Sequence, residues 1–381
     1  MDLRLSLYQY TWGTFELVIP EMANGSNVCL LPSDVVERAP ALREVLWDIL
    51  GWDKDAVVAV ERFTNALSNH VFMVTKGGDS PESVVVRVFG SADGSALDSV
   101  RVYELLSAAG ITPASLGRFL NGRVEAYLQG FAVIDSLPMM RQYAEGIAQE
   151  LARFHVLATR ALGEGRAPVE SLCGRLRRWR DEVEALGMEL PEWVREGLLK
   201  VDVEGVIGSI GGFEEEAVLH GDLQAGNIMV PTDLPSWSSG VHSDVRSGVR
   251  SGVRTGVRFI DVEYLCRGPV SFDLSNHFLE WSWSGDYSVL DYREERWPDL
   301  AERQSFVAAY VGARGWSSGA VNRLMAEVDV CVRVSHLHWA LWGVLEGARR
   351  QESAGWDYLG YAKGRYGRLL SGSTRRIEVC D

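Results

Sequence analysis

Three polar side chains, His220, Asp222 and Asn227, lie in one loop between two apolar stretches of the chain. A rigid scaffold presents a few polar groups in this way, so the loop is a candidate site. Four residues separate Asp222 from Asn227, so a tight loop can aim a carboxylate at a substrate hydroxyl while an amide oxygen faces a divalent cation. Asp261 follows the apolar pair Phe259 and Ile260 and adds a hard oxygen ligand for Mg²⁺. These residues together have the chemistry that phosphoryl transfer needs.

Each of these residues has an ordinary structural explanation when taken alone. An Asp in a Gly-containing loop is commonly a turn residue, and an Asn beside Gly commonly forms a bend. The combination favours a functional site, because Asp261 stands at the end of an apolar stretch of its own.

The spacing of this loop resembles that of a known superfamily. His220-x-Asp222-x-x-x-x-Asn227, followed by Ile260-Asp261, is similar to the catalytic and metal loops of aminoglycoside phosphotransferases and choline kinase-like proteins, which are relatives of the protein kinases. Two further strings resemble the choline/ethanolamine kinase family itself: Phe272-Asp-Leu-x-Asn-His-Phe-x-Glu-Trp281 and Ser335-His-x-x-Trp339-x-x-Trp342. The matches run in order from about residue 60 to residue 366, so the resemblance covers most of the chain.

The resemblance implies roles for the loop residues. Asp222 orients the substrate hydroxyl and accepts its proton, with His220 and Asn227 completing the catalytic loop. Asn227 and Asp261 hold Mg²⁺, with Glu263 beside them, and ATP is the phosphoryl donor. Asp273 resembles a buried aspartate that keeps the loop in shape.

The nucleotide side of the site departs from the family in one respect. Residues 62–70 occupy the place of a Gly-containing nucleotide loop, yet this segment has no glycine. Ser68 and Asn69 can offer side-chain donors instead. Arg87, in the apolar strand 84–90, matches an arginine that reaches the ATP phosphates. The helix expected at 97–109 should carry its acidic partner, Asp98 or Glu104, and residues 125–127, Glu125 and Tyr127 included, should meet adenine through their backbone.

The acceptor side combines one carboxylate with aromatic side chains, as an alkylammonium ion requires. The residues that the resemblance places there are Glu280, Tyr264, Trp281 or Trp283, Trp339, Trp342, Tyr358 and Tyr361. Helical aromatic stripes are normally core, and the resemblance is what favours a binding wall here. Ethanolamine and choline both fit this mixture. The local strings Arg62-Phe-Thr and Leu359-Gly-Tyr-Ala362 resemble ethanolamine kinases, whereas Leu67-Ser-Asn69 and Glu280-Trp281 resemble choline kinases, and the balance favours ethanolamine slightly.

The elements that position these residues follow from periodicity. Helices are predicted at residues 40–50, 97–109, 139–159 and 172–187, the last as a solvated helix, and His155 is predicted to be a packed core histidine. Strands are predicted at 57–74 and 83–89, followed by a hairpin within 117–128 that turns at Asn121 and Gly122.

These elements, with the resemblance, predict a two-lobed, protein-kinase-like α+β fold. The small antiparallel N-terminal lobe spans residues 1–126 and binds the nucleotide, and the mainly helical lobe spans 127–381. A Val-Arg repeat at about 239–257 reads as an expanded hairpin loop between the catalytic loop and Asp261.

Composition narrows the class of protein further. The formal net charge of −14 argues against nucleic acid or an anionic membrane as the main partner. No stretch approaches a membrane span, and the five scattered cysteines indicate neither a disulfide framework nor a zinc site. We expect a cytoplasmic enzyme with a small amino alcohol as its partner, without stable membrane insertion, and a homodimer is compatible with the resemblance.

Two other functions are compatible with the loop motif. An aminoglycoside, homoserine or methylthioribose kinase would use the same loop, but the Asn276–Trp281 string and the pair Trp339 and Trp342 argue against these. A pseudokinase acting as a binding module would explain the glycine-free loop and the displaced helix acid. The intact Asp222, Asn227 and Asp261 count against it.

Overall fold

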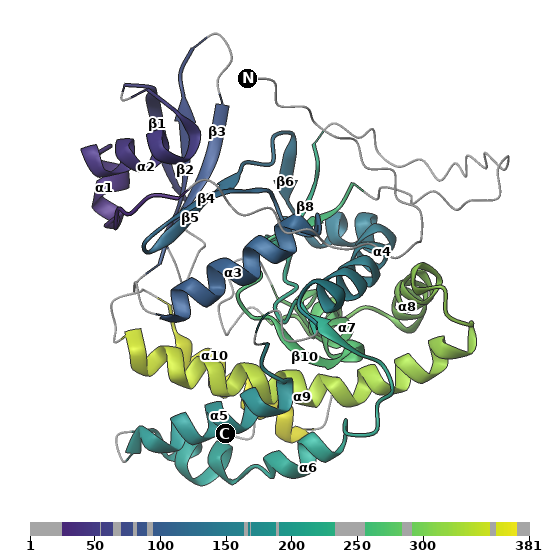
Figure 1. Cartoon of the computed structure of the whole chain (residues 1–381). Coiled ribbons are helices and arrows are strands. Elements are labelled where there is room, and N and C mark those ends of the chain that lie inside the picture. Colours follow the sequence, from purple (N-terminus) through teal and green to yellow (C-terminus); the bar gives the residue numbers. More distant parts are fainter. Residues whose placement is uncertain are drawn as a thin grey trace, which may run out of the picture.

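The computed structural model describes residues 25–53, 55–63, 70–78, 82–89, 94–163, 167, 169–187, 190–232, 256–283, 292–350 and 356–371. Figure 1 shows an antiparallel sheet with two small helices at one end of the molecule, and a larger, mainly helical part beside it. This is the two-lobed α+β architecture that the sequence predicted.

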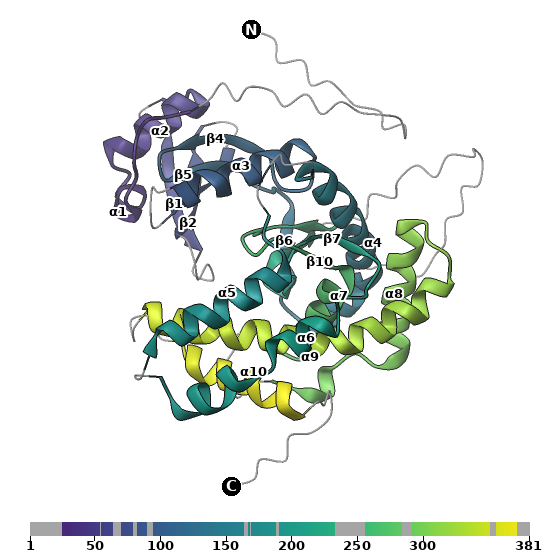
Figure 2. The same ribbon diagram turned by 60° about the horizontal axis from the view of Figure 1, so that its bottom comes forward.

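The N-terminal lobe is built on a five-stranded antiparallel sheet with the strand order β1-β2-β3-β5-β4. Its strands are β1 (Val57–Phe63), β2 (His70–Lys76), β3 (Glu82–Val88), β4 (Ser115–Phe119) and β5 (Gly122–Ala126). Alternate residues of β2 and β3, such as Phe72 and Val86, are buried against the apolar face of α2 (Pro40–Leu50). Figure 2 shows α2 and the short α1 (Pro32–Val36) on the outer side of this sheet, away from the helical lobe.

The C-terminal lobe is arranged around one buried helix, α7 (Val270–Glu280), every residue of which is buried. The helices around it are α4 (Leu137–Ala161), α5 (Leu172–Ala185), α6 (Val203–Gly208), α8 (Leu300–Arg314), α9 (Gly319–Arg350) and α10 (Tyr358–Ser371). The long α9 packs against α7, α5 and α10, and Figure 2 shows α9 and α10 side by side. Helix α3 (Gly94–Ala108) lies between the two lobes in Figure 1 and packs on β4, β5 and α4.

Two small antiparallel sheets carry the loops that matter for chemistry. One pairs β7 (Glu216–Leu219) with β10 (Cys266–Pro269), and the other has the order β6-β8-β9 (Phe131–Val133, Ile228–Pro231 and Arg258–Phe259). The loop between β7 and β8 therefore starts in one sheet and ends in the other. A 3-10 turn, η4 (Ala225–Asn227), closes this loop.

Most predicted elements are confirmed. The helices expected at 40–50, 97–109, 139–159 and 172–187 correspond to α2, α3, α4 and α5, and the predicted hairpin joins β4 to β5. The stretch predicted as one strand at 57–74 instead contains β1 and most of β2. The prediction of α5 as a solvated helix is wrong on one side, because Leu172, Leu176, Trp179 and Val183 are buried.

Most of the Val-Arg repeat, at 233–255, lies outside the described residues. The flanking strands β8 and β9 are antiparallel neighbours, with Met229 opposite Arg258. The repeat thus lies in the connection of a β-hairpin, as predicted. In the part of the chain that the structure describes, none of the helices has the length and apolar character needed to cross a membrane.

Candidate active site

Asp273 of α7 fixes the loop that follows β7. Its buried carboxylate accepts hydrogen bonds from the backbone N–H groups of His220, at 2.6 Å, and Gly221, at 2.9 Å, and lies 3.0 Å from Nε2 of His155. Burial alone would raise the pKa of Asp273, but the His155 hydrogen bond and the nearby charges hold that pKa below its usual value. The predicted structural role of Asp273 and the packed position of His155 are both seen in these contacts.

Gly221 gives this loop a conformation that other residues rarely adopt. Its φ is +81°, and a Cβ built on it would lie 2.1 Å from the carbonyl oxygen of Tyr264. The loop and the segment after Asp261 therefore touch backbone to backbone. A glycine is required for that approach.

His220 ties the same two segments together. Its buried Nε2 lies 3.1 Å from the carbonyl oxygen of Ile260, and its Nδ1 lies 3.4 Å from the backbone N–H of Asp222. A neutral ring with the proton on Nε2 satisfies both contacts. Burial lowers the pKa of His220, in keeping with that neutral form. These contacts make His220 a positioning residue of the predicted catalytic loop.

Asn227 orients the carboxylate of Asp222. Its Nδ2 donates to the backbone oxygen of Asp222 at 2.8 Å and to Oδ2 of Asp222 at 3.0 Å. The amide nitrogen is thus turned toward Asp222, which leaves Oδ1 of Asn227 as the group available to a cation. Burial, together with the charges of Glu280 and Asp261, raises the pKa of Asp222 to about 8.

Arg87 of β3 joins three acidic side chains. Its Nη1 lies 2.6 Å from Glu263 and 3.4 Å from Asp261, and its Nε lies 3.2 Å from Glu125 of β5. Arg123 and Tyr103 also bind Glu125, at 2.8 Å and 2.9 Å. Burial raises the pKa of Asp261 to about 6, although the nearby Arg87 opposes this shift.

These contacts correct the expected acidic partner of Arg87. Helix α3 was expected to supply it, but Asp98 is exposed and Glu104 faces Arg118 at 3.9 Å. The partner within the N-terminal lobe is Glu125, whose side chain is buried in the middle of the sheet.

The backbone at Asp261 has an unusual conformation. Its φ is +62°, which is uncommon for a residue with a side chain. The preceding residue is held in place, since the N–H of Ile260 donates to the backbone oxygen of Asn227 at 3.0 Å. This hydrogen bond joins Asn227 to the residue before Asp261, so it holds the two candidate metal ligands close together. Backbone strain of this kind is concentrated at functional sites.

The predicted acceptor residues form one aromatic cluster. Tyr264 lies next to Trp339 and Trp342, with ring centroids 5.5 Å and 6.4 Å apart, and its hydroxyl accepts from Nε1 of Trp342 at 2.8 Å. Trp342 in turn contacts Tyr358 and Tyr361, at 5.8 Å and 6.0 Å. Trp283 packs on Tyr361 at 5.3 Å. The predicted acceptor aromatics, with Trp283 rather than its alternative Trp281, are thus connected in one cluster.

Sequence reasoning missed three members of this neighbourhood. Trp356 packs on Tyr358, Tyr361 and Trp342. The buried Asn276 accepts hydrogen bonds from Nε1 of Trp339 at 2.7 Å and from Ser335 at 2.9 Å. Arg365 binds Glu280 at 2.8 Å. The helical spacing of Arg365, four residues after Tyr361, is the sequence signal that could have identified it.

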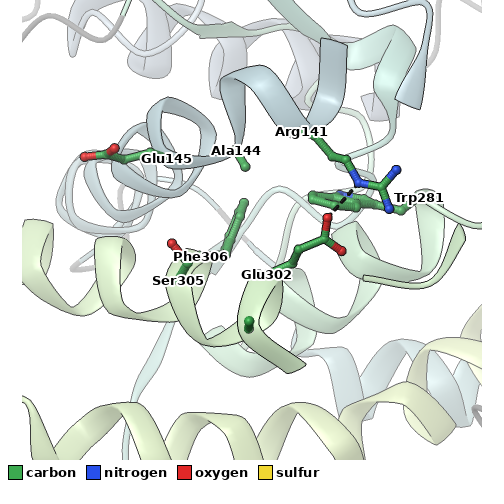
Figure 3. A pocket seen from close by; sticks show the side chains of 8 residues that line it. Arg141, Ala144, Glu145, Trp281, Glu302, Ser305 and Phe306 are labelled. Atoms are coloured by element: carbon green, nitrogen blue, oxygen red, sulfur yellow. Dashed lines mark hydrogen bonds and ion pairs between the residues drawn. The ribbon is translucent and has the colours of Figure 1, made fainter. Parts of the chain in front are cut away.

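Other predicted site residues do not join the cluster or are not described. Ser68 and Asn69 lie outside the described residues. Tyr127 follows β5, and its carbonyl accepts from the N–H of Gln129 at 3.1 Å. Trp281, the alternative to Trp283, faces the opposite way: it lines a surface cavity of about 300 Å³ between α4 and α8, shown in Figure 3. Arg141 and Glu302 pair across that cavity at 2.7 Å.

The comparisons with known proteins agree with this geometry. The sequence profile described as choline/ethanolamine kinase matches residues 60–369. A probable choline kinase 2 of Arabidopsis thaliana is 27% identical over 357 residues, which cover 88% of this chain and 91% of that protein. Ethanolamine kinase 2 of Mus musculus is 26% identical over 333 residues, which cover 82% and 76% of the two chains.

A solved structure shares the fold. The choline kinase of Cryptosporidium parvum superimposes with a TM-score of 0.67 at 18% identity, over 87% of this chain and 94% of that one. The profile match alone extends over most of the sequence, from β1 to α10. The chain belongs to the choline/ethanolamine kinase family.

Proposed function

We propose that the protein transfers the γ-phosphoryl group of ATP to the hydroxyl of choline or ethanolamine. The observation that carries this proposal is the position of Asp222. Its carboxylate is fixed by Asn227, and it lies close enough to Glu280 for the charge of Glu280 to raise the pKa of Asp222. One carboxylate thus stands between the polar loop and the aromatic cluster, where a two-carbon amino alcohol would place its hydroxyl.

The donor set suits Mg²⁺. Among the residues that the structure describes, no three His, Cys, Asp or Glu side chains are grouped to hold a metal ion by themselves. Mg²⁺ commonly binds one or two carboxylates and completes its shell with water and phosphate oxygens. Asp261 and Oδ1 of Asn227 would hold the ion, with Glu263 beside them. When bound, Mg²⁺ supplies positive charge that neutralises the phosphates.

The protein's own groups account for the remaining requirements. Asp222 accepts a hydrogen bond from the substrate hydroxyl, aligns its oxygen with the γ-phosphorus, and takes the proton as the new O–P bond forms. A carboxyl group with a pKa near 8 is mostly protonated at neutral pH, and a substrate cation nearby lowers that pKa. Asp222 thus becomes a base when the amino alcohol is present.

The nucleotide lies between the lobes in this proposal. Arg87 stands beside the metal carboxylates, where its Nη1 and Nη2 can reach phosphate oxygens while Nε stays on Glu125. Adenine meets the backbone near Tyr127 in this proposal, and Ser68 and Asn69, which lie outside the described residues, are the candidate side-chain donors to the phosphates. The pairing of Arg87 with Glu125 also removes one of the two reasons to consider a pseudokinase.

The test is ADP release from Mg·ATP with choline, with ethanolamine and with no acceptor. Stimulation by either alcohol supports the proposal, and the ratio of the two kcat/KM values ranks the substrates. The Asp222→Asn variant should lose turnover while its melting temperature stays within a few degrees of the wild type. Binding of Mg·ATP without stimulation by either alcohol would refute the proposal, and parallel wells with an aminoglycoside and homoserine would then identify another acceptor.

A further inference from the structure

Arg365 of α10 is a fully buried arginine in the acceptor region. Its Nη2 donates to Oε1 of Glu280 at 2.8 Å, and its Nε donates to the hydroxyl of Tyr361 at 3.0 Å. The guanidinium carbon lies 4.8 Å from the ring centroid of Trp283 and 5.1 Å from that of Tyr361. A cation of the protein itself therefore binds one carboxylate and two rings that the sequence assigned to the substrate.

This arrangement divides the predicted acceptor residues into two groups. Trp283 carries Arg365 against its ring and has Arg368 at 5.6 Å, while it also packs on Tyr292 and Tyr361. Its ring is thus already occupied by cations and neighbouring side chains. Tyr264 and Trp356 are the members of the cluster that keep partly exposed surface. The rings with surface left to meet a substrate cation are therefore those of Tyr264 and Trp356, which both contact Trp342.

The ion pair with Arg365 also affects the protonation state of Glu280. A buried carboxyl group without a partner is expensive to ionise, and burial does raise the pKa of Glu280, against the opposing charge of Arg365. Arg365 engages Oε1 only. Within the described residues Oε2 of Glu280 makes no hydrogen bond, so it can accept one from a primary ammonium or lie against a quaternary one.

Other titratable groups around the pair come from α9, α10 and the catalytic loop. His336 and His338 of α9 are buried, and burial with the charge of Arg365 lowers their pKa values well below the usual one, so both rings are neutral. Burial raises the pKa of Tyr361, so its hydroxyl stays neutral as well. The ionisable groups that face Glu280 are thus Arg365 on one side and Asp222 on the other.

We propose that Arg365 is a positioning residue for the cationic end of the substrate and acts through Glu280. It holds Oε1 of Glu280 and leaves Oε2 toward the ammonium group of the substrate. The substrate hydroxyl is then kept in reach of Asp222. This inference rests on the proposed function, because it assigns the amino-alcohol end of the same site.

The test compares five variants by KM, kcat and melting temperature. Arg365→Met keeps the length of the side chain and removes its charge, so KM for choline and for ethanolamine should rise about tenfold, with kcat changed less than about threefold. Arg365→Lys should recover part of this loss. Arg368→Met is the matched control, since Arg368 stacks on Tyr292 at 3.6 Å and has no hydrogen bond to Glu280, and its KM should stay at the wild-type value.

The double variant Glu280→Gln with Arg365→Met separates positioning from simple structural support. If Arg365 acts through Glu280, the double variant has the same KM as Glu280→Gln alone. If Arg365→Met does not fold because Glu280 is left unpaired, the double variant still folds, because it has no buried carboxylate at position 280. The neutral isostere of choline, 3,3-dimethyl-1-butanol, should inhibit wild type and Arg365→Met equally, because it carries no charge. Distortion of the cavity would weaken its inhibition as well.

Three results would overturn the inference. The first is that the KM increases of Glu280→Gln and Arg365→Met multiply in the double variant. The second is that the neutral alcohol inhibits Arg365→Met less than the wild type, as choline binding is weakened. The third is that Arg365→Met leaves KM unchanged. Any of these with an active wild type refutes the role of Arg365 and leaves the proposed function intact. A wild type without turnover on either amino alcohol refutes both.

Discussion

Arg87 and Glu125 form an ion pair within the N-terminal sheet, with 3.2 Å between Nε and Oε1. Their strands β3 and β5 are hydrogen-bonded neighbours, with Val85 opposite Glu125. In protein kinases the equivalent basic residue takes its acidic partner from a helix, which can move and switch the enzyme. Both partners here belong to one sheet, and α3 contributes to the pair through Tyr103, whose hydroxyl donates to Oε2 of Glu125 at 2.9 Å.

Glu125→Gln should therefore weaken nucleotide binding. The substitution keeps the size of the side chain and removes the charge that holds Nε of Arg87, so we expect KM for ATP to rise about tenfold, or about 1.4 kcal/mol. Asp98→Asn on the exposed face of α3 is the control and should leave KM for ATP unchanged. Steady-state kinetics with varied ATP measure both, and a larger effect from Asp98→Asn would contradict the assignment.

The pKa of Asp222 should appear in the pH dependence of turnover. The profile of kcat/KM reports the free enzyme, and a base with a pKa of about 8 is active only when deprotonated. The profile should thus rise with pH, with its midpoint near 8. Glu280→Gln removes one of the charges that raise this pKa, so the midpoint should move to lower pH. A wild-type midpoint in the ordinary carboxyl range would show that the pKa of Asp222 is not raised in the free enzyme.

Gly221→Ala should damage the loop far more than another glycine substitution with similar φ. A Cβ at Gly221 would collide with the backbone of Tyr264, whereas Gly110, with φ of +68°, has open space around it. Gly110→Ala meets only the conformational cost, about 1–2 kcal/mol. We expect Gly221→Ala to lose more stability than that in urea unfolding and to lose most of its kcat. Equal stability losses would show that the loop can move away from Tyr264.

The contacts of the candidate catalytic loop could be predicted from the sequence, because the residues that make them lie close together in the chain. Asp222 and Asn227 are connected by direct hydrogen bonds across a short loop. The aromatic residues also came together as expected, since pairs such as Trp339 and Trp342 share one helical face. The spacing of residues within one loop or one helix is therefore enough to predict these contacts.

Partners that are distant in sequence could not be predicted in the same way. Glu125 was expected to serve through its backbone, but its side chain is the one that pairs with Arg87, because strand order places β3 beside β5. Arg365 and Glu280 are 85 residues apart and meet only when α10 packs on the rest of the lobe. The spacing of Arg365 after Tyr361 places both on one face of α10, but it does not indicate that the partner is Glu280 of another helix.

Shortening the Val-Arg repeat tests whether that segment is only a connection. The strands it joins, β8 and β9, are already paired, with Ile228 opposite Phe259, so a short turn can replace residues 236–254 without moving Asn227 or Asp261. Loop-closure entropy changes slowly with length, so the shorter loop should leave stability equal or slightly higher. We expect kcat and both KM values to stay within about twofold of the wild type.

A scrambled repeat of the same length and charge is the control, because it keeps the arginines and changes only their spacing. A loss of turnover in the shortened protein that the scrambled one does not share would mean that the arginines take part in nucleotide binding.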